Sequence, residues 1–474
     1  MKRKYVVIVL SFWFALSGAA IPAPAALPNF GIGVSAGYLS TLASDSNGVL
    51  YAWGNNNQGV VPFSEISHES EFDPREIPFP NQEKIVRVAS SGGSQVFLAI
   101  DENGDLWSWG GNGSTSGDAR GLGNPTSSSG DIDGATVYSD EFKVTSPAKA
   151  RFDEGTSVLG SPTGETIVDI AYEMLGKATI ALDSAGRVWL AGGTDAIDPV
   201  AIFGSGQRAD EFRLLPGQDG TNNLGDSKII DIEINESFII FLTENGTVYG
   251  LGTDSYSSVS SGALAGEGGS SGTGDTSTFR QISDTTDPKL VELRANQLEP
   301  TWYALDEDGA VYGKGRAESS SYSLFGDPGI SSDQSVLTKL SLAFEGERIT
   351  DFAAGSRRIM AFVDNLGNLY TWGNRIKSQD TSTPEKLAKP ADMAPDEVFE
   401  RVYASTNNYL IASTSAGNLY TFGSVPASIK NPVVEGSDKV DFSDLGAVFS
   451  STALSAANAE PESSTPAPTP YTGP

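Results

Sequence analysis

Short apolar segments alternate with turn residues along almost the whole chain, and one unit of this pattern recurs seven times. Each unit has an apolar strand that runs into a four-residue turn ending in Gly, followed by a strand that carries aromatic residues and also ends in Gly. The seven turns are 45–48, 101–104, 183–186, 243–246, 306–309, 364–367 and 414–417. A repeat of roughly 50–80 residues that contains only strand signals is typical of a β-propeller or a similar array.

Each unit predicts four strands. A short apolar strand such as 85–88 comes first, and a second strand such as 97–100 enters the turn. The third strand carries the aromatic residues, and a looser fourth segment such as 75–78 often contains Pro. Four short strands joined by turns form one antiparallel blade. We therefore predict an all-β fold, a seven-bladed β-propeller of four-stranded antiparallel blades.

The acidic turns and the aromatic residues both have structural explanations. Asp or Thr at the first turn position accepts a backbone hydrogen bond, and Gly at the fourth adopts a positive φ. The aromatic residues alternate with smaller ones, so they all lie on one side of their strand, where they are expected to pack against the next blade rather than stack on a ligand. These structural blade aromatics are Trp53, Trp107, Trp109, Trp189, Tyr249, Tyr312, Tyr370, Trp372 and Tyr420.

The two ends of the chain differ from the repeats. Three basic residues at 2–4, an apolar run at 5–16 and small residues after it predict a secretory signal peptide over 1–25, with an uncleaved anchor as the alternative. The propeller is predicted over 29–455, including a final half-repeat at 440–454 that could close the ring. The Ala/Ser/Thr/Pro-rich segment 456–474 reads as a tail or linker.

The repeats resemble those of the regulator-of-chromosome-condensation (RCC1-like) repeat family, and the predicted export favours its secreted bacterial type. The best matches to the family pattern, an apolar strand followed by Gly, aromatic residues and Gly, are 42–54, 98–110, 304–315 and 362–373. This resemblance implies a seven-bladed ring that binds through the loops of one face, as one secreted propeller does when it inhibits β-lactamases. The family's Gly-x-x-His element is missing, because the only histidine is His68.

The charge of the chain restricts its partners. It has 60 acidic and 31 basic residues, which gives a formal net charge of −29. Such a surface repels nucleic-acid phosphates and anionic membranes. We therefore expect a secreted, extracellular monomer with no nucleic-acid partner and no membrane insertion after signal cleavage. A basic protein is the kind of partner that this charge favours, although the sequence does not identify it, and a cell-surface location would follow if the polypeptide continues beyond the tail.

Several kinds of chemistry are excluded by composition. There is no Cys, so disulfides, zinc–thiolate sites and cysteine nucleophiles cannot form, and a catalytic triad would have to use His68. We expect no enzymatic activity, no cofactor and no metal. The segment 129–141 partly matches a calcium-loop spacing, with Asp131, Asp133 and Asp140 as its candidate ligands, but Ser stands at the first ligand position.

Long polar insertions separate the repeats at 111–130, 194–226, 253–278 and 316–335. Loops on a rigid scaffold commonly carry function. Four aromatic residues in or beside these insertions are candidate partner contacts, namely Tyr138, Tyr256, Tyr322 and Phe325. The sequence predicts a secreted non-catalytic scaffold that mediates protein–protein interaction through the loops of one ring face. The alternative is an extracellular glycan-binding or glycan-cleaving propeller with loop tyrosines and paired carboxylates in its central funnel, and a third is a cell-surface spacer.

Overall fold

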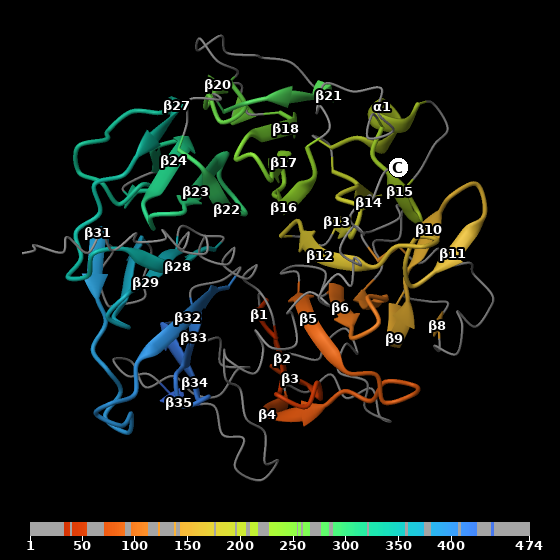
Figure 1. Ribbon diagram of the computed structural model, residues 1–474, viewed down its shortest axis with the longest axis horizontal. Coiled ribbons are helices and arrows are strands. Elements are labelled where there is room, and N and C mark those ends of the chain that lie inside the picture. The colour runs from red at the N-terminus through yellow and green to blue at the C-terminus, as the bar shows by residue number, and fades with distance from the viewer. Residues whose placement is uncertain are drawn as a thin grey trace, which may run out of the picture.

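The structure is a computed structural model in which seven sheets surround a central axis (Figure 1). It describes residues 33–37, 40–54, 71–90, 96–111, 122–123, 137–138, 143–174, 177–194, 197–204, 209–216, 227–253, 255–256, 259–265, 276–283, 288–319, 322–355, 359–373, 381–405, 409–423 and 438–439. The predicted seven-bladed β-propeller of four-stranded antiparallel blades is confirmed.

Each blade is built from strands that follow one another in the chain, from the innermost (first) to the outermost (fourth). Blades one to three contain β1 (Val34–Ala36), β2 (Ser40–Ser44), β3 (Leu50–Gly54) and β4 (Glu71–Glu76); β5 (Ile85–Ser90), β6 (Val96–Asp101), β7 (Leu106–Gly111) and β9 (Lys143–Lys149); and β12 (Ile167–Tyr172), β13 (Ala178–Asp183), β14 (Val188–Gly192) and β15 (Phe212–Leu214).

Blades four to seven repeat the same order. They contain β16 (Ile229–Ile234), β17 (Phe238–Thr243), β18 (Val248–Gly252) and β21 (Thr276–Gln281); β22 (Leu290–Ala295), β23 (Thr301–Asp306), β24 (Val311–Gly315) and β27 (Gln334–Lys339); β28 (Ile349–Ala354), β29 (Ile359–Asp364), β30 (Leu369–Gly373) and β31 (Thr381–Lys386); and β32 (Phe399–Ala404), β33 (Tyr409–Thr414), β34 (Leu419–Gly423) and β35 (Asp438–Lys439).

A few short elements extend this plan. The strand β8 (Val137–Tyr138) adds to the edge of blade two, and the hairpin of β10 (Arg151–Asp153) and β11 (Ser157–Leu159) adds to blade three, where β10 pairs in parallel with β15. Two small hairpins and one short helix lie in the insertions. They are β19 (Ser255–Tyr256) with β20 (Val259–Ser260), β25 (Glu318–Ser319) with β26 (Tyr322–Ser323), and α1 (Pro199–Phe203).

The ring closes between its first and seventh blades, each of which has its own four strands. The innermost strands contact one another in order around the axis, and β32 contacts β1. Across this joint the hydroxyl of Tyr409 donates a hydrogen bond to the carbonyl of Gly37 at 2.8 Å. The half-repeat predicted at 440–454 lies outside the described residues.

The turn Asp of a repeat holds both the turn and the aromatic residue that follows it. In blade two, Asp101 Oδ1 accepts from the backbone N–H groups of Asn103 and Asp105 at 2.9 and 3.0 Å. Its Oδ2 accepts from Trp107 Nε1 at 2.9 Å. The equivalent bond to the aromatic joins Asp183 to Trp189 and Asp306 to Tyr312. In these repeats one Asp carboxylate therefore stabilises the turn and also holds the aromatic side chain that follows it.

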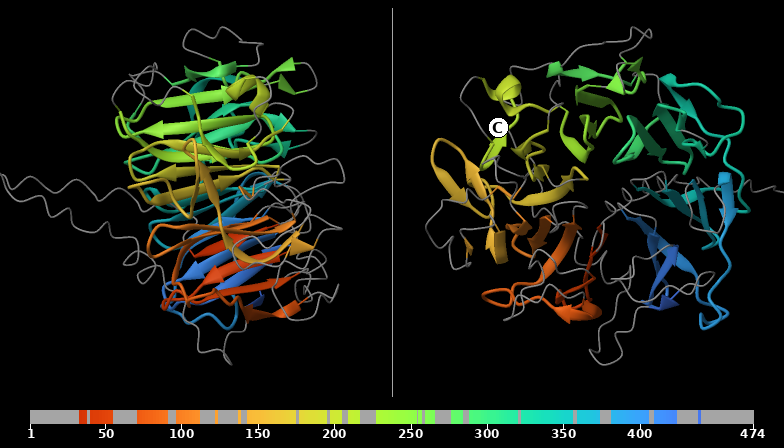
Figure 2. Two further views of the ribbon diagram at one scale, coloured as in Figure 1. Left: turned by 90° about the vertical axis from the view of Figure 1, so that its right-hand side faces the viewer. Right: turned by 180° about the vertical axis from the view of Figure 1, so that it is seen from behind.

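All nine blade aromatics named above are buried. In blade six, Tyr370 stacks on Phe362 with ring centroids 4.9 Å apart. Trp372 Nε1 donates to the carbonyl of Leu324 in blade five at 3.1 Å, whereas Leu369 packs in the cluster shared with blade seven. In blade six the large rings thus lie on the side that faces blade five, and Leu369 lies on the side that faces blade seven. Figure 2 shows that neighbouring blades pack face to face.

Turn glycines also make contact with the next blade, and this gives a test of the seams. Gly104 has φ +78, and an added Cβ would lie 2.3 Å from Cβ of Thr166; Gly164 has φ +80 with nothing within 4 Å of an added Cβ. We expect Gly164→Ala to cost about 1 kcal/mol of unfolding free energy from the backbone alone. Gly104→Ala should cost about 1–3 kcal/mol more because of the clash. Urea unfolding of both variants measures the difference, and equal losses would contradict the close seam.

Candidate functional site in the central channel

Six of the seven innermost strands carry a charged residue at the same place. Each of these strands has an irregularity after its first residue, where the register shifts by one. Such a bulge re-aims the side chain that it carries. The residues that follow the shift, which we call the belt residues, are Arg87, Asp169, Asp231, Glu292, Asp351 and Arg401, and all six are buried.

The belt residues join neighbouring blades. Arg87 of blade two forms an ion pair and hydrogen bond with Asp169 of blade three. Asp231 Oδ2 accepts from the backbone N–H of Leu293 in the next blade at 2.6 Å. Asp351 makes the same contact with the blade that follows it, through the N–H of Val402 at 2.5 Å. These charged groups thus tie innermost strands together around the axis.

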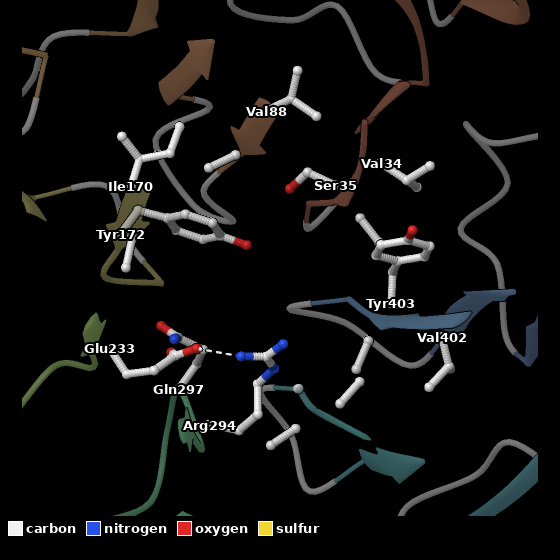
Figure 3. A pocket seen from close by; sticks show the side chains of 17 residues that line it. Val34, Ser35, Val88, Ile170, Tyr172, Glu233, Arg294, Gln297, Val402 and Tyr403 are labelled. Carbon is white, nitrogen blue, oxygen red and sulfur yellow. Dashed lines mark hydrogen bonds and ion pairs between the residues drawn. The ribbon is translucent and has the colours of Figure 1, made fainter. Parts of the chain in front are cut away.

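A cavity of about 140 Å³ lies next to the belt, toward the end of the innermost strands where the chain turns into the second strands. Figure 3 shows that side chains from separate blades converge on it. The polar ones among its lining residues are Ser35, Tyr172, Glu233, Arg294, Gln297 and Tyr403. Glu233 and Arg294 are only 16% and 13% exposed, so the cavity reaches two charged groups that bulk water barely touches.

Arg294 is the positive centre of this cavity, and its donors are used within the ring. Its Nε donates to the carbonyl of Phe352 at 3.2 Å, and Nη1 donates to the carbonyl of Leu293 at 2.6 Å. Nη1 also contacts Glu233 at 3.4 Å, and Nη2 pairs with Glu292. The guanidinium therefore spans blades four to six.

Burial raises the pKa of the carboxyl groups around the channel. It raises the pKa of Glu233 to about 8 and that of Asp231 to about 7, with Arg294 acting in the opposite direction. It also raises the pKa of Asp351 to about 7, and those of Glu292 and Asp169 move upward in the same way. The native channel therefore retains protons near neutral pH.

Sequence reasoning missed this site, although a signal was present. The third position of strands such as 85–88 and 167–170 is charged between apolar neighbours, as Arg87 and Asp169 illustrate. This alternation by itself predicts a strand and does not show that the charged residues meet. In blade four the turn between the first and second strands is held by Asn235, whose Oδ1 accepts from the N–H groups of Ser237 and Phe238 at 2.9 Å each.

The aromatic residues predicted to contact a partner come from separate elements of the ring. Tyr138, Tyr256 and Tyr322 lie in β8, β19 and β26, and their side chains are outside the described part of the structure. Phe325 is fully buried against Tyr303, with ring centroids 6.1 Å apart, and it covers Gly313 of β24. Phe325 is therefore a core residue and not a contact residue.

The candidate metal ligands Asp131, Asp133 and Asp140 lie outside the described residues. Within the residues that are described, no three acidic or histidine side chains gather closely enough to hold a metal ion. Within the described part of the chain, no helix has both the length and the apolar character needed to cross a membrane. The glycan hypothesis depended on loop tyrosines whose side chains are not described, so it stays a hypothesis.

Strand order decides where the insertions emerge. Because each blade has four antiparallel strands, the turns between first and second strands and the connections between third and fourth strands lie on one face of the ring. We call this the insertion face. It receives the connections 55–70, 112–142, 193–211, 253–275, 316–333, 374–380 and 424–437, whereas the opposite face carries the tight Gly turns. The cavity lies at the insertion-face end, since Gln297 and Gly355 of the first turns line it.

Comparison with known proteins agrees with the repeat pattern. The family model "Regulator of chromosome condensation (RCC1) repeat" matches residues 32–60. The human E3 ubiquitin-protein ligase HERC2 is 26% identical over 316 residues, which is 65% of this chain and 5% of HERC2. The Ultraviolet-B receptor UVR8 of Arabidopsis thaliana is 34% identical over 77 residues, 16% of this chain and 17% of the receptor. The chain thus spans only a small part of the length of these relatives.

Solved structures show the same fold. Human WBSCR16 aligns with a TM-score of 0.59 and 16% identity over 83% of this chain and 95% of its own. Prp20p of Saccharomyces cerevisiae, described with its binding to Gsp1p and histones, aligns with a TM-score of 0.57 and 19% identity over 80% of this chain and 81% of its own. These structures show the propeller fold, and the RCC1 repeat model matches one segment of the chain, residues 32–60.

Proposed function

We propose that this RCC1-like propeller is a secreted, non-catalytic scaffold that binds another protein through its insertion face. The observation that carries the proposal is the strand order, which brings the connections between third and fourth strands of all blades to that one face. A rigid ring that presents many loops on one side is a common way to build a binding surface. Prp20p, which has this fold, is described as binding Gsp1p and histones.

The partner that we propose is a basic protein. The chain carries a formal net charge of −29, and long-range attraction of this size speeds the approach of a positively charged surface. Export is proposed from the N-terminal basic, apolar and small-residue order at 1–25. Binding to such a partner should weaken as salt screens the field.

The orientation of an immobilised bait tests the proposal. Because the chain has no Cys, one introduced cysteine can be biotinylated at a single site. Ala201 is exposed in α1 of an insertion-face connection, whereas Asn103 is exposed in a Gly turn on the opposite face. We expect bait tethered through Asn103→Cys to capture a basic protein from culture medium, with release in high salt. Bait tethered through Ala201→Cys should capture at least tenfold less of that protein.

The two baits differ only in the position of the introduced cysteine and are immobilised at the same surface density. A difference in the amount of captured protein therefore reports the orientation of the ring. Equal capture by both would contradict use of the insertion face. Recovery of oligosaccharide without protein would overturn the protein-partner proposal and favour the glycan alternative.

A further inference from the structure

Among the residues that the structure describes, the channel holds more acidic than basic groups. The described cations are Arg87, Arg294 and Arg401, and the described carboxyl groups are Asp169, Asp231, Glu233, Glu292 and Asp351. Buried carboxylates that lack a countercharge either hold protons or attract a cation. This excess of carboxyl groups therefore favours the binding of a positively charged group in the channel.

Among the described lining residues, the buried side-chain atoms without a hydrogen-bond partner are Gln297 Oε1, which can only accept, and the Tyr403 hydroxyl, which can accept as well as donate. The guanidinium of Arg294 is directed to the carbonyls of Leu293 and Phe352 and to the carboxyl groups of Glu233 and Glu292. Its donors are thus engaged within the ring. A molecule that enters the cavity meets carboxylate, amide and hydroxyl oxygens around an arginine that already has partners.

Gln297 gives a second and independent indication. Its Nε2 donates to the carbonyl of Ile234 at 2.9 Å, which fixes the orientation of the amide. Its Oε1 has no hydrogen-bond partner, although the residue is only 9% exposed. Figure 3 shows this side chain beside Glu233 and below Tyr172, and Gln297 is one of the residues that line the cavity. A buried acceptor without a donor is unfavourable, so a ligand that donates an N–H to this oxygen would be stabilised here.

We infer that the cavity binds a small organic cation with N–H donors, an alkylammonium or guanidinium group, held by Gln297 Oε1 and the Glu233 carboxylate. The volume of about 140 Å³ resembles that of a cavity that holds benzene, so it suits about six heavy atoms. A metal ion fits less well, since the described residues do not gather three ligands. The cation could be a free amine or a Lys or Arg side chain of a protein on the insertion face.

Binding of this cation should depend on pH through Glu233. The groups that face this carboxyl are Arg294 and Glu292 on β22, Asp231 on its own strand, and Asp169 and Tyr172 on β12. Burial holds the pKa of Glu233 at about 8. Its ionised fraction therefore rises from about one tenth at pH 7 to about nine tenths at pH 9. Affinity for a cation should rise about tenfold over the same range.

Calorimetric titration of the full chain with methylguanidinium and n-butylammonium tests the inference, with tetramethylammonium as a cation that has no N–H donor. We expect methylguanidinium and n-butylammonium to bind at pH 9 and to bind about tenfold more weakly at pH 7, and we expect no binding of tetramethylammonium.

Gln297→Met should weaken the binding of both cations at least tenfold. Gln281→Met is the matched control, because Gln281 also donates through Nε2 to a carbonyl, that of Ser283 at 2.9 Å, and lies outside the cavity; it should bind as the wild type does.

Glu233→Gln keeps the shape of the side chain and provides a second variant if Gln297→Met does not fold. It should abolish the pH dependence of cation binding and weaken binding at least tenfold.

Nα-acetyl-arginine amide tests whether the cation is a free amine or the side chain of a bound protein. If it is a side chain, this compound should bind at least as tightly as methylguanidinium; if it is a free amine, the compound should bind more weakly. Absence of binding by both small cations at pH 9, or equal binding by Gln297→Met, would overturn the inference. Because no protein partner is used, this outcome is separate from failure of the proposed function.

Discussion

Replacing Asp183 by Ala is expected to lower the free energy of unfolding by about 3–5 kcal/mol. The side chain is fully buried, and its Oδ1 accepts from the backbone N–H of Arg187 at 2.9 Å. Its Oδ2 accepts from Arg187 Nε at 2.7 Å and from Trp189 Nε1 at 2.9 Å. Alanine would leave the indole N–H buried without a partner and release the turn. Equilibrium unfolding in urea, followed by tryptophan fluorescence, measures the loss.

Thr243 provides the matched control, because it occupies the same turn position in blade four. Its Oγ1 lies 2.6 Å from Asn245 Oδ1 and 2.8 Å from the Thr247 carbonyl oxygen, and its single proton is donated to one of them; no bond between Thr243 and the aromatic Tyr249 is described. Thr243→Ala should therefore cost only about 1–2 kcal/mol. If both variants lose the same free energy of unfolding, the hydrogen bond between Asp183 and Trp189 does not contribute the extra stability that we expect.

The local parts of the fold could be predicted from sequence because each repeat contains their causes. The turn at 183–186 has its Asp and its Gly, and Trp189 follows at a fixed distance. Seven copies of such a unit define the number of blades, since each blade is a nearly independent hairpin array. What the sequence did not reveal is that Asp183 and Trp189 are bonded to each other.

The channel could not be derived in the same way, because its contacts join residues that are distant in the chain. Asp351 meets the N–H of Val402 only after two blades have packed, and Arg294 meets Glu233 across 61 positions. The charged third residue of six innermost strands is visible in the sequence, but the partner of each depends on how the blades pack into the ring. The insertion face, in contrast, can be derived from the sequence. In a blade of four antiparallel strands, the connections after the first and third strands lie on the same face of the ring.

Phe325 shows how an insertion can mislead. It lies in a polar stretch and looked available to a partner, but its ring covers Gly313, where an added Cβ would lie 2.5 Å from it. In blade four Leu264 covers Gly250 in the same manner, at 2.7 Å. A glycine in the middle of a third strand thus indicates that an apolar residue returns from the following insertion to cover it.

The raised pKa values of the channel carboxyl groups predict that the protein loses stability as the pH rises from 5.5 to 7.5. Burial raises the pKa of Glu233 from about 4.5 to about 8 and those of Asp231 and Asp351 to about 7. Between these limits the native state holds protons that the unfolded state has released, so the unfolding free energy falls with pH. One retained proton gives about 1.4 kcal/mol per pH unit, or about 3 kcal/mol over the two units. Urea unfolding at closely spaced pH values measures this decline.

Two controls separate the channel from the general acidity of the chain. In 1 M NaCl the Debye length falls to about 3 Å, which screens repulsion among surface carboxylates but not among buried ones; the decline should persist there. Glu233→Gln imitates the protonated side chain and should reduce the decline by about 1 kcal/mol or more. Glu345→Gln removes a carboxylate that is 63% exposed and should keep the wild-type profile. A decline that disappears in salt, or that Glu345→Gln reduces as much as Glu233→Gln, would assign the effect to the surface, because only a buried proton is insensitive to both changes.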